Sequence, residues 1–148
     1  MTSNLETLTE INLDDLVSSF GWQHSPLLSR LLRIFFRKPA RTFAQHVVEY
    51  DDTVGTHGIV EGGWNLSRRY VQDIRIIGAD RIPESAFLAL SNHPGMTDTL
   101  ALFAALNRKD LRIIALDRPF LNALPHTTAQ LFYVYDDPAK RMTLVRQV

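Results

Sequence analysis

Residues 91–100 have the sequence SNHPGMTDTL, and the prediction of the fold starts from them. A short apolar run, residues 86–90, leads into it, and a second one, residues 100–106, leads out of it. The first run has the length of a buried strand, whereas the second is rich in Ala and Leu and favours a helix. The sequence therefore predicts a strand that enters a helix through a polar turn. Strand ends and helix N-termini converge at such turns in α/β proteins, and chemistry is often found there.

The turn holds one imidazole, His93, and one carboxylate, Asp98. On an unbroken helix this spacing would separate the two side chains by roughly 140°, so they could not meet. Pro94 and Gly95 form a strong turn signal between them, and we expect Asp98 to reach back from the first turn of the helix. A carboxylate on one ring nitrogen fixes the tautomer and leaves the other nitrogen free to accept a proton. The same residues allow a second interpretation, in which Thr97 or Asp98 only caps the helix.

Further strands are predicted on both sides of this turn, at residues 74–77, 111–116 and 131–135. A strand, helix, strand order with a single helical crossover predicts parallel pairing in a right-handed βαβ unit. The predicted fold class is therefore α/β, with N-terminal helices followed by a mixed or parallel sheet. We expect residues 1–70 to form the helical region and residues 71–148 to form a partial α/β domain.

The N-terminal region is predicted to be helical in pieces. A short helix is expected near residues 13–20, and Pro26 opens a longer one that ends before Pro39. Residues 41–50 continue as helix, whereas residues 51–63 contain four glycines and are expected to form a loop.

The helix that begins at Pro26 is amphipathic. A Leu and Phe face beside a basic edge is what an interfacial membrane helix requires. A surface helix that packs on the protein's own core shows the same pattern. The residues predicted to contact a membrane are Leu28, Arg30, Leu31, Arg33, Phe35 and Arg37.

Composition excludes several classes of function. Sixteen basic residues balance sixteen acidic ones, so no net field attracts nucleic acid. Without cysteine there is no disulfide and no thiol nucleophile, which fits a cytosolic environment. No apolar stretch reaches the ~20 residues that cross a bilayer, and the N-terminus lacks a signal peptide. His24, His46 and His57 have no partner at metal-ligand spacing, so no metal site is predicted.

The string NHPGMTD, residues 92–98, resembles the N-H-x-x-x-x-D block of the glycerolipid acyltransferase superfamily, which includes lysophosphatidate and glycerol-3-phosphate acyltransferases. Residues 74–83 resemble the strand and the Gly and Pro turn that precede this block, and the resemblance covers about residues 71–135. It implies that His93 deprotonates a hydroxyl of a glycerolipid-like acceptor while Asp98 orients the imidazole. The hydroxyl then attacks an acyl thioester of coenzyme A or acyl carrier protein, with no other cofactor. Because such acceptors reside in membranes, the resemblance also implies a cytoplasmic, peripheral position on the inner face of a membrane.

The same resemblance suggests residues that bind substrate. Backbone N–H groups near residues 95–97 are candidates for stabilising the oxyanion. The family's second block carries an Arg that contacts the acceptor's phosphate, but here Asp136 and Asp137 follow the predicted strand, and two acids would repel a phosphate. Arg118 and Arg141 are candidate substitutes. The full set of predicted substrate-binding residues is Asn92, Gly95, Thr97, Arg118 and Arg141.

Two later blocks of the family, an F-P-E-G-like one and a Pro-containing one, do not occur in these 148 residues. We therefore expect an incomplete acyltransferase-like fold that corresponds to the N-terminal part of the family only. The alternative is a truncated, inactive fragment that binds membranes or acts as a scaffold. The sequence leaves the acceptor, the acyl length, the thioester carrier and the oligomeric state open.

Overall fold

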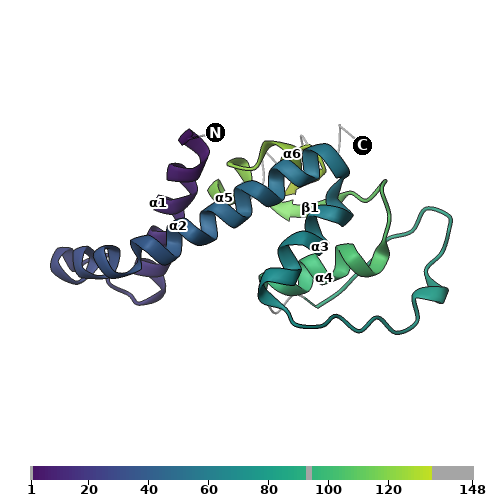
Figure 1. The fold of residues 1–148 in the computed structure, drawn as a ribbon, viewed down its shortest axis with the longest axis horizontal. Helices are drawn as coiled ribbons and strands as arrows, with labels where there is room; N and C mark the ends of the chain where they lie inside the picture. The colour runs from purple at the N-terminus through teal and green to yellow at the C-terminus, as the bar shows by residue number, and fades with distance from the viewer. Residues whose placement is uncertain (1, 93–94, 135–148) are drawn as a thin grey trace.

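The computed structural model describes residues 2–92 and 95–134. Most of these residues are helical, and two short strands lie near the C-terminal end of the described chain (Figure 1). In chain order the elements are α1 (Thr2–Ser19), α2 (Pro26–His57), α3 (Ile59–Tyr70), the 3₁₀ turn η1 (Ala79–Arg81), α4 (Met96–Leu106), β1 (Ile113–Leu116), α5 (Pro119–Asn122), α6 (Pro125–Thr128) and β2 (Leu131–Val134).

The helices α1 and α2 form an antiparallel hairpin whose turn lies at one end of the molecule (Figure 1). Both are longer than the sequence predicts. The prediction that the second helix ends before Pro39 is wrong, because α2 continues through this residue to His57. A proline inside a helix removes one backbone hydrogen bond. Here the ring lies on the exposed side of the helix, while the opposite side packs on α1 over several turns, which offsets that loss.

The predicted loop at residues 51–63 is also helical. Only Gly58 interrupts it, with a φ of +91° that favours glycine, and α3 begins at the next residue. The other glycines allow helices to approach closely. A Cβ atom on Gly62 would lie 2.7 Å from Cγ2 of Val54, and one on Gly63 would lie 3.2 Å from the carbonyl oxygen of Leu100. These glycines therefore set the contacts of α3 with α2 and α4.

Two apolar clusters stabilise the described chain. One joins α2, α3 and α4 with β1, and its buried members are Tyr50, Val54, Ile59, Leu66, Leu100 and Phe103. The other joins α1 and α2 with the segment that holds α5 and α6, and its buried members are Leu8, Ala44, Val47 and Leu124. Burying a large apolar side chain contributes about 1.5–3 kcal/mol, so these clusters hold the helices together.

The sheet consists of β1 and β2, which pair in parallel with Ile113 opposite Leu131. Both strands form as the sequence predicts, and so does the helix after the polar turn. The predicted pairing is wrong, because the strand expected before the polar turn does not form and β1 pairs in parallel with β2 instead. The crossover between the two strands passes through α5 and α6. A coarse α/β class is therefore present, although helices dominate the described residues.

Residues 71–92 differ from the prediction. This stretch runs as a long irregular loop away from the rest of the molecule (Figure 1), and the strands predicted at residues 74–77 and 86–90 do not form. Leu88 and Leu90 are 72% and 86% exposed. An isolated extended segment gains no stability without a neighbouring strand to accept its backbone hydrogen bonds. Among the described residues β1 pairs only with β2, so this stretch has no partner.

Arg108 anchors the middle of that irregular stretch. Its guanidinium donates hydrogen bonds to the carbonyl oxygens of Pro83 (3.1 Å) and Glu84 (2.8 Å), and it lies 5.8 Å from the ring centre of Phe87. Asp110 accepts two further hydrogen bonds from the same guanidinium. One side chain just after α4 thus holds the stretch that precedes α4.

Candidate functional site

The polar turn predicted from the sequence lies at the start of α4. The Gly95 N–H donates a hydrogen bond of 2.9 Å to Oδ1 of Asp98, which stands in the first turn of the helix. Because Gly95 has no side chain to return a bond, this cap is one-sided. A carboxylate in the first turn also interacts favourably with the helix dipole. The structure therefore brings together two of the predicted site residues, Gly95 and Asp98.

The predicted general base, His93, lies outside the described residues, and so does Arg141. The contact between His93 and Asp98 therefore stays a prediction. Asn92, on the near side of the turn, is exposed, and so is Thr97 on the first turn of α4. The N–H groups of a first helical turn have no acceptor within the helix, so they can bind an oxyanion.

Arg118 lies at another strand end. It is the second residue after β1 and the residue before α5, and its side chain is exposed. Its backbone oxygen accepts a hydrogen bond of 3.1 Å from the Asn122 N–H. The structure thus places this arginine at the carboxyl end of β1, on a different element from the turn at Gly95.

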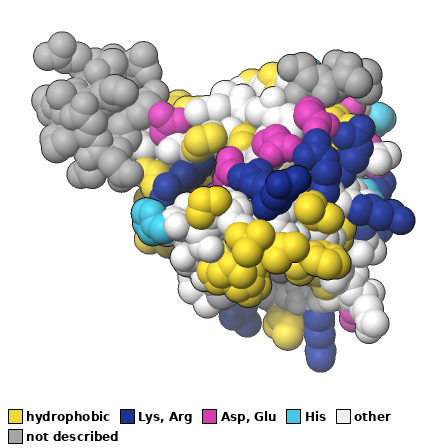
Figure 2. All heavy atoms as spheres, turned by 90° about the vertical axis from the view of Figure 1, so that its left-hand side faces the viewer, with side chains coloured by type: hydrophobic (Ala, Val, Ile, Leu, Met, Phe, Trp, Pro, Cys, Tyr) yellow, Lys and Arg dark blue, Asp and Glu magenta, His cyan; other side chains and the backbone are white. Residues whose placement is uncertain are grey.

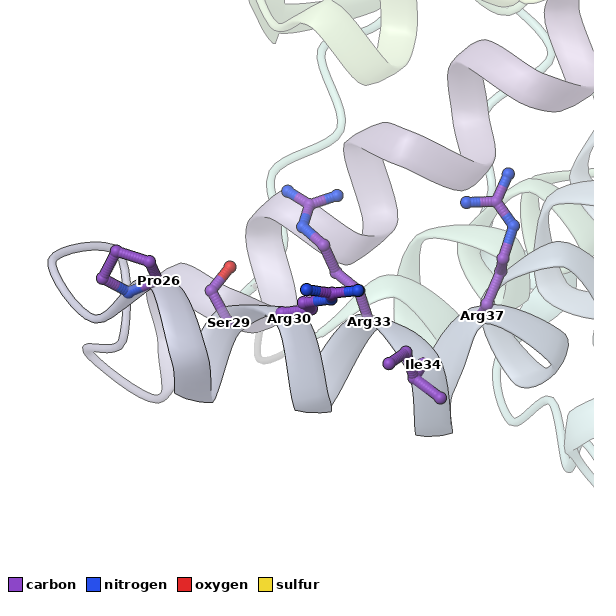
Figure 3. A pocket seen from close by; sticks show the side chains of 6 residues that line it. All are labelled: Pro26, Ser29, Arg30, Arg33, Ile34 and Arg37. Carbon is purple, nitrogen blue, oxygen red and sulfur yellow. The ribbon is translucent and has the colours of Figure 1, made fainter.

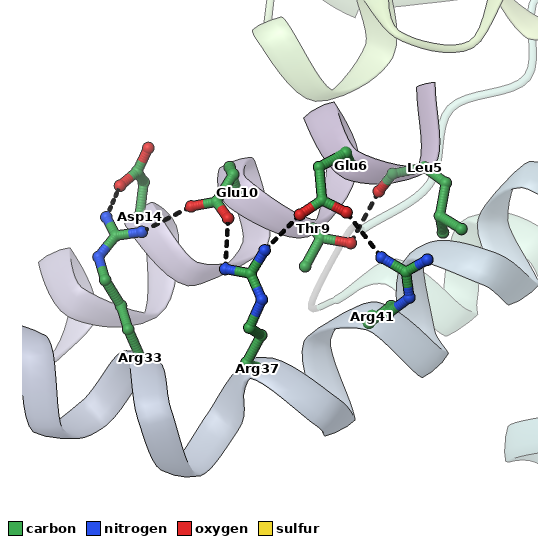
Figure 4. A network of polar contacts seen from close by, with 8 residues as sticks. All are labelled: Leu5, Glu6, Thr9, Glu10, Asp14, Arg33, Arg37 and Arg41. Atoms are coloured by element: carbon green, nitrogen blue, oxygen red, sulfur yellow. Dashed lines mark hydrogen bonds and ion pairs between the residues drawn. The ribbon is translucent and has the colours of Figure 1, made fainter. Parts of the chain in front are cut away.

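The predicted membrane helix carries a regular set of ion pairs with α1. Arg33 donates to Glu10 (2.9 Å) and Asp14, Arg37 donates to Glu10 (2.9 Å) and Glu6, and Arg41 donates to Glu6 (2.6 Å) (Figure 4). Acids spaced four residues apart on α1 thus face arginines spaced four residues apart on α2. We call these six side chains, Glu6, Glu10, Asp14, Arg33, Arg37 and Arg41, the charge ladder.

The charge ladder gives two sides of α2 different roles. Arg33 and Arg37 point toward α1, whereas Ile34 points away from it (Figure 3). Five of the exposed large apolar side chains of α2 share one side of the helix at about 100° per residue, and they define what we call the outer face: Leu27, Leu28, Leu31, Ile34 and Phe35. Of the residues predicted to contact a membrane, Leu28, Leu31 and Phe35 belong to this exposed face, while two of the three arginines are engaged by α1.

An open groove of about 270 Å³ runs along the same part of α2. Its lining residues are Pro26, Ser29, Arg30, Arg33, Ile34 and Arg37 (Figure 3). Arg30 is exposed and has no ion pair with any residue that the structure describes. It is therefore a cation available for binding at the border of the outer face.

A buried polar contact, which was not predicted from the sequence, joins α2 to α6. Asp51, which is almost fully buried, accepts hydrogen bonds from the N–H groups of His126 (3.2 Å) and Thr127 (2.7 Å) and from the Thr127 hydroxyl (2.7 Å). This carboxylate caps a helix 75 residues away in the chain, so no local motif could reveal it. Burial raises the pKa of the neighbouring Tyr50 to about 12, and the charge of Asp51 adds to the rise, although a hydrogen bond with Thr127 opposes it. All these groups are engaged with one another, which indicates a structural role.

Two absences hold for the residues that the structure describes. They include no group of histidines and acids able to hold a metal ion. None of their helices, including α2, is both long and apolar enough to cross a membrane.

Comparisons of the chain with protein-family models, with curated proteins and with solved structures gave no match.

Proposed function

We propose that the chain is an acyltransferase region that transfers a fatty acyl group from a thioester of coenzyme A or acyl carrier protein to a hydroxyl of a glycerolipid-like acceptor. The supporting observation is the turn at Gly95, which places Asp98 in the first turn of α4, five residues after His93 in the sequence. His93 is the general base and Asp98 orients it. The residues proposed to bind substrate are Asn92, Gly95, Thr97 and Arg118, together with Arg141.

The reaction forms an ester bond and breaks a thioester bond. His93 accepts the proton of the acceptor hydroxyl, whose oxygen attacks the thioester carbonyl. The tetrahedral oxyanion is stabilised by N–H groups at the start of α4. It collapses with loss of the thiolate, which takes the proton back from His93. The step needs no enzyme nucleophile, consistent with the lack of cysteine.

Thiol release tests this proposal. The purified chain is mixed with an acyl-coenzyme A and a lysophospholipid in detergent micelles, and free thiol is followed with a thiol reagent. Because the chain has no cysteine, only the released coenzyme reacts. We expect His93→Ala to lower the rate about 100-fold or more, since general-base catalysis contributes about 10²–10⁴. The control is His24→Ala. Equal rates for the His93→Ala variant and the wild type, or no release by either, would overturn the proposal.

A second candidate function is membrane binding without catalysis. The observation that favours it is the outer face, where Leu27 and Phe35 are 70% and 74% exposed. Scattered exposed apolar residues are ordinary, but a contiguous face of this kind marks an interaction surface. In that case the chain binds lipid vesicles while thiol release stays at background. Vesicle binding and thiol release, measured together, therefore distinguish the two candidate functions.

A further inference from the structure

The charge ladder changes what the α1–α2 hairpin can recognise. A basic amphipathic helix is normally attracted to anionic headgroups through its row of cations. Here Glu6, Glu10 and Asp14 meet Arg33, Arg37 and Arg41 in matching register, so the formal charges of the ladder cancel (Figure 4). A row that looks cationic in the sequence is therefore neutral as an assembled surface.

The end of the hairpin carries no formal charge at all. Residues 16–29 contain no Asp, Glu, Lys or Arg, and we call them the hairpin tip. The rings of Phe20 and Trp22 stack there with centroids 5.1 Å apart, and Phe20 is exposed. Aromatic side chains of this kind favour the boundary between lipid and water. The first ion pair above the tip joins Arg33 to Asp14, one from each helix.

The apolar and charged side chains are separated on the surface. Figure 2, which views the molecule from the hairpin end, shows apolar side chains gathered below a band of basic and acidic ones. The outer face continues the tip along α2, and its member Ile34 points away from α1 (Figure 3). Only the cations Arg30 and Lys38 lie near this face without an ion pair to a described residue. The patch thus has the apolar area for insertion but little charge to direct it.

We propose that the hairpin tip and the outer face dock into a phospholipid bilayer by apolar insertion, and that this docking does not require anionic lipid. The charge ladder stays in water on the side of α2 that faces α1, and Arg30 lies in the headgroup layer at the border of the outer face. The proposal deepens the proposed function, on which it rests, because it states how the chain reaches acceptors that reside in a membrane. It differs from the sequence-based expectation, in which three arginines hold the chain to anionic headgroups.

Vesicle binding tests the proposal with the full chain. Sedimentation is measured with vesicles of phosphatidylcholine alone and with vesicles that also contain phosphatidylglycerol. The partition coefficients for the two compositions are expected to agree within about threefold, and to change by less than about threefold between about 0.05 and about 0.5 M NaCl, which screens charge. Binding only to anionic vesicles, lost at the higher salt concentration, would overturn the proposal.

Variants locate the surface. Leu27→Ser/Phe35→Ser is expected to lower partitioning into phosphatidylcholine about tenfold or more, because each large apolar side chain moved out of water contributes strongly. Leu88→Ser/Leu90→Ser is the matched control, since these side chains are equally exposed but lie outside the hairpin. Circular dichroism verifies that both variants are folded. Equal losses in the two variants would contradict the assignment to the hairpin.

A third variant removes the acidic partners of the ladder arginines, and it is expected to strengthen binding to anionic lipid. In Glu6→Gln/Glu10→Gln/Asp14→Asn the three arginines lose their partners, and partitioning into anionic vesicles is expected to rise about tenfold or more and to become salt-dependent. Partitioning into phosphatidylcholine alone stays unchanged. No gain on anionic vesicles would mean that the ladder does not mask the arginines, which contradicts the proposal.

Two results distinguish bilayer docking from acyl transfer and from self-association of the chain. Thiol release in detergent micelles tests acyl transfer without a bilayer, so active enzyme that binds no vesicles would overturn the docking and leave the proposed function standing. Sedimentation equilibrium measures self-association without lipid. A dimer that Leu27→Ser/Phe35→Ser dissociates, combined with no vesicle binding, would assign the outer face to a second copy of the chain and overturn the proposal.

Discussion

The helical core and the stretch at residues 71–92 are both rich in apolar residues, yet only the first buries them. In the core, α2, α3 and α4 lie close in the chain and enclose Tyr50, Leu66 and Phe103. In the stretch, Leu88 and Leu90 are left in solvent. A helix forms its backbone hydrogen bonds internally and needs only an apolar neighbour to bury its side chains. A strand needs a partner strand to form its backbone hydrogen bonds as well. The difference is therefore one of partners rather than of composition.

The largest expected effect compares one apolar residue from each region. Phe103→Ala removes a buried ring and is expected to lower the free energy of unfolding by about 3–5 kcal/mol. Leu90→Ala removes an exposed side chain and should change it by less than about 0.5 kcal/mol. Urea denaturation measures both. A loss at Leu90 as large as that at Phe103 would mean that the stretch is packed in solution.

A buried carboxylate gives the next effect. Asp51→Ala leaves the N–H groups at the start of α6 without their acceptor and is expected to lower the free energy of unfolding by about 2–3 kcal/mol. The adjacent Asp52 is exposed, so Asp52→Ala is the matched control, with a change below about 0.5 kcal/mol. If the two variants unfold at the same urea concentration, the carboxylate does not join α2 to α6.

The pKa of Tyr50 predicts a dependence of stability on pH. Burial raises this pKa from 10.0 to about 12, so the folded protein holds the phenolic proton more tightly than the unfolded chain does. The contribution to stability is fully present below pH 10, and it is lost as the pH rises to about 12. The fall should be on the order of 2 kcal/mol in urea denaturation. Tyr50→Phe should abolish this part of the pH dependence, and an unchanged fall in that variant would assign it to another group.

The smallest expected effect concerns the anchor of the irregular stretch. Arg108→Ala removes the hydrogen bonds to Pro83 and Glu84 but leaves both cores intact. Limited proteolysis within residues 82–90 should become about threefold to tenfold faster, while the free energy of unfolding changes by less than about 1 kcal/mol. Lys109→Ala is the neighbouring control. Unchanged proteolysis would show that the guanidinium does not hold the stretch.

The sequence predicted most of what depends on nearby residues. The helix after the polar turn and the two strands follow from short apolar runs. The pairing of these two strands with each other did not follow, because the parallel unit was predicted across α4. The continuation of α2 through Pro39 did not follow, because packing on α1 outweighs the local cost of a proline. The strands at residues 74–77 and 86–90 were predicted wrongly, because β propensity says nothing about whether a partner strand exists.

In the candidate site, too, features set by nearby residues could be predicted and features set by distant residues could not. The position of Asp98 on the first turn of α4 could be predicted, since Pro94 and Gly95 break the chain just before it. The neutralisation of Arg33 and Arg37 could not, since a helical wheel drawn for one helix omits the acids that a second helix brings. Asp51 could not be found either, because its hydrogen-bond donors stand 75 and 76 residues further along the chain.

A conservative variant of Asp98 separates its two possible roles, which are to orient His93 and to cap α4. In Asp98→Asn the amide oxygen still accepts the Gly95 N–H, so this hydrogen bond of the cap is kept. The charge that orients and stabilises an imidazolium is lost, together with its interaction with the helix dipole. We expect thiol release to fall about 100-fold or more, while the free energy of unfolding changes by less than about 1 kcal/mol. Thiol release at the wild-type rate would show that Asp98 only caps α4 and would contradict its role in orienting His93.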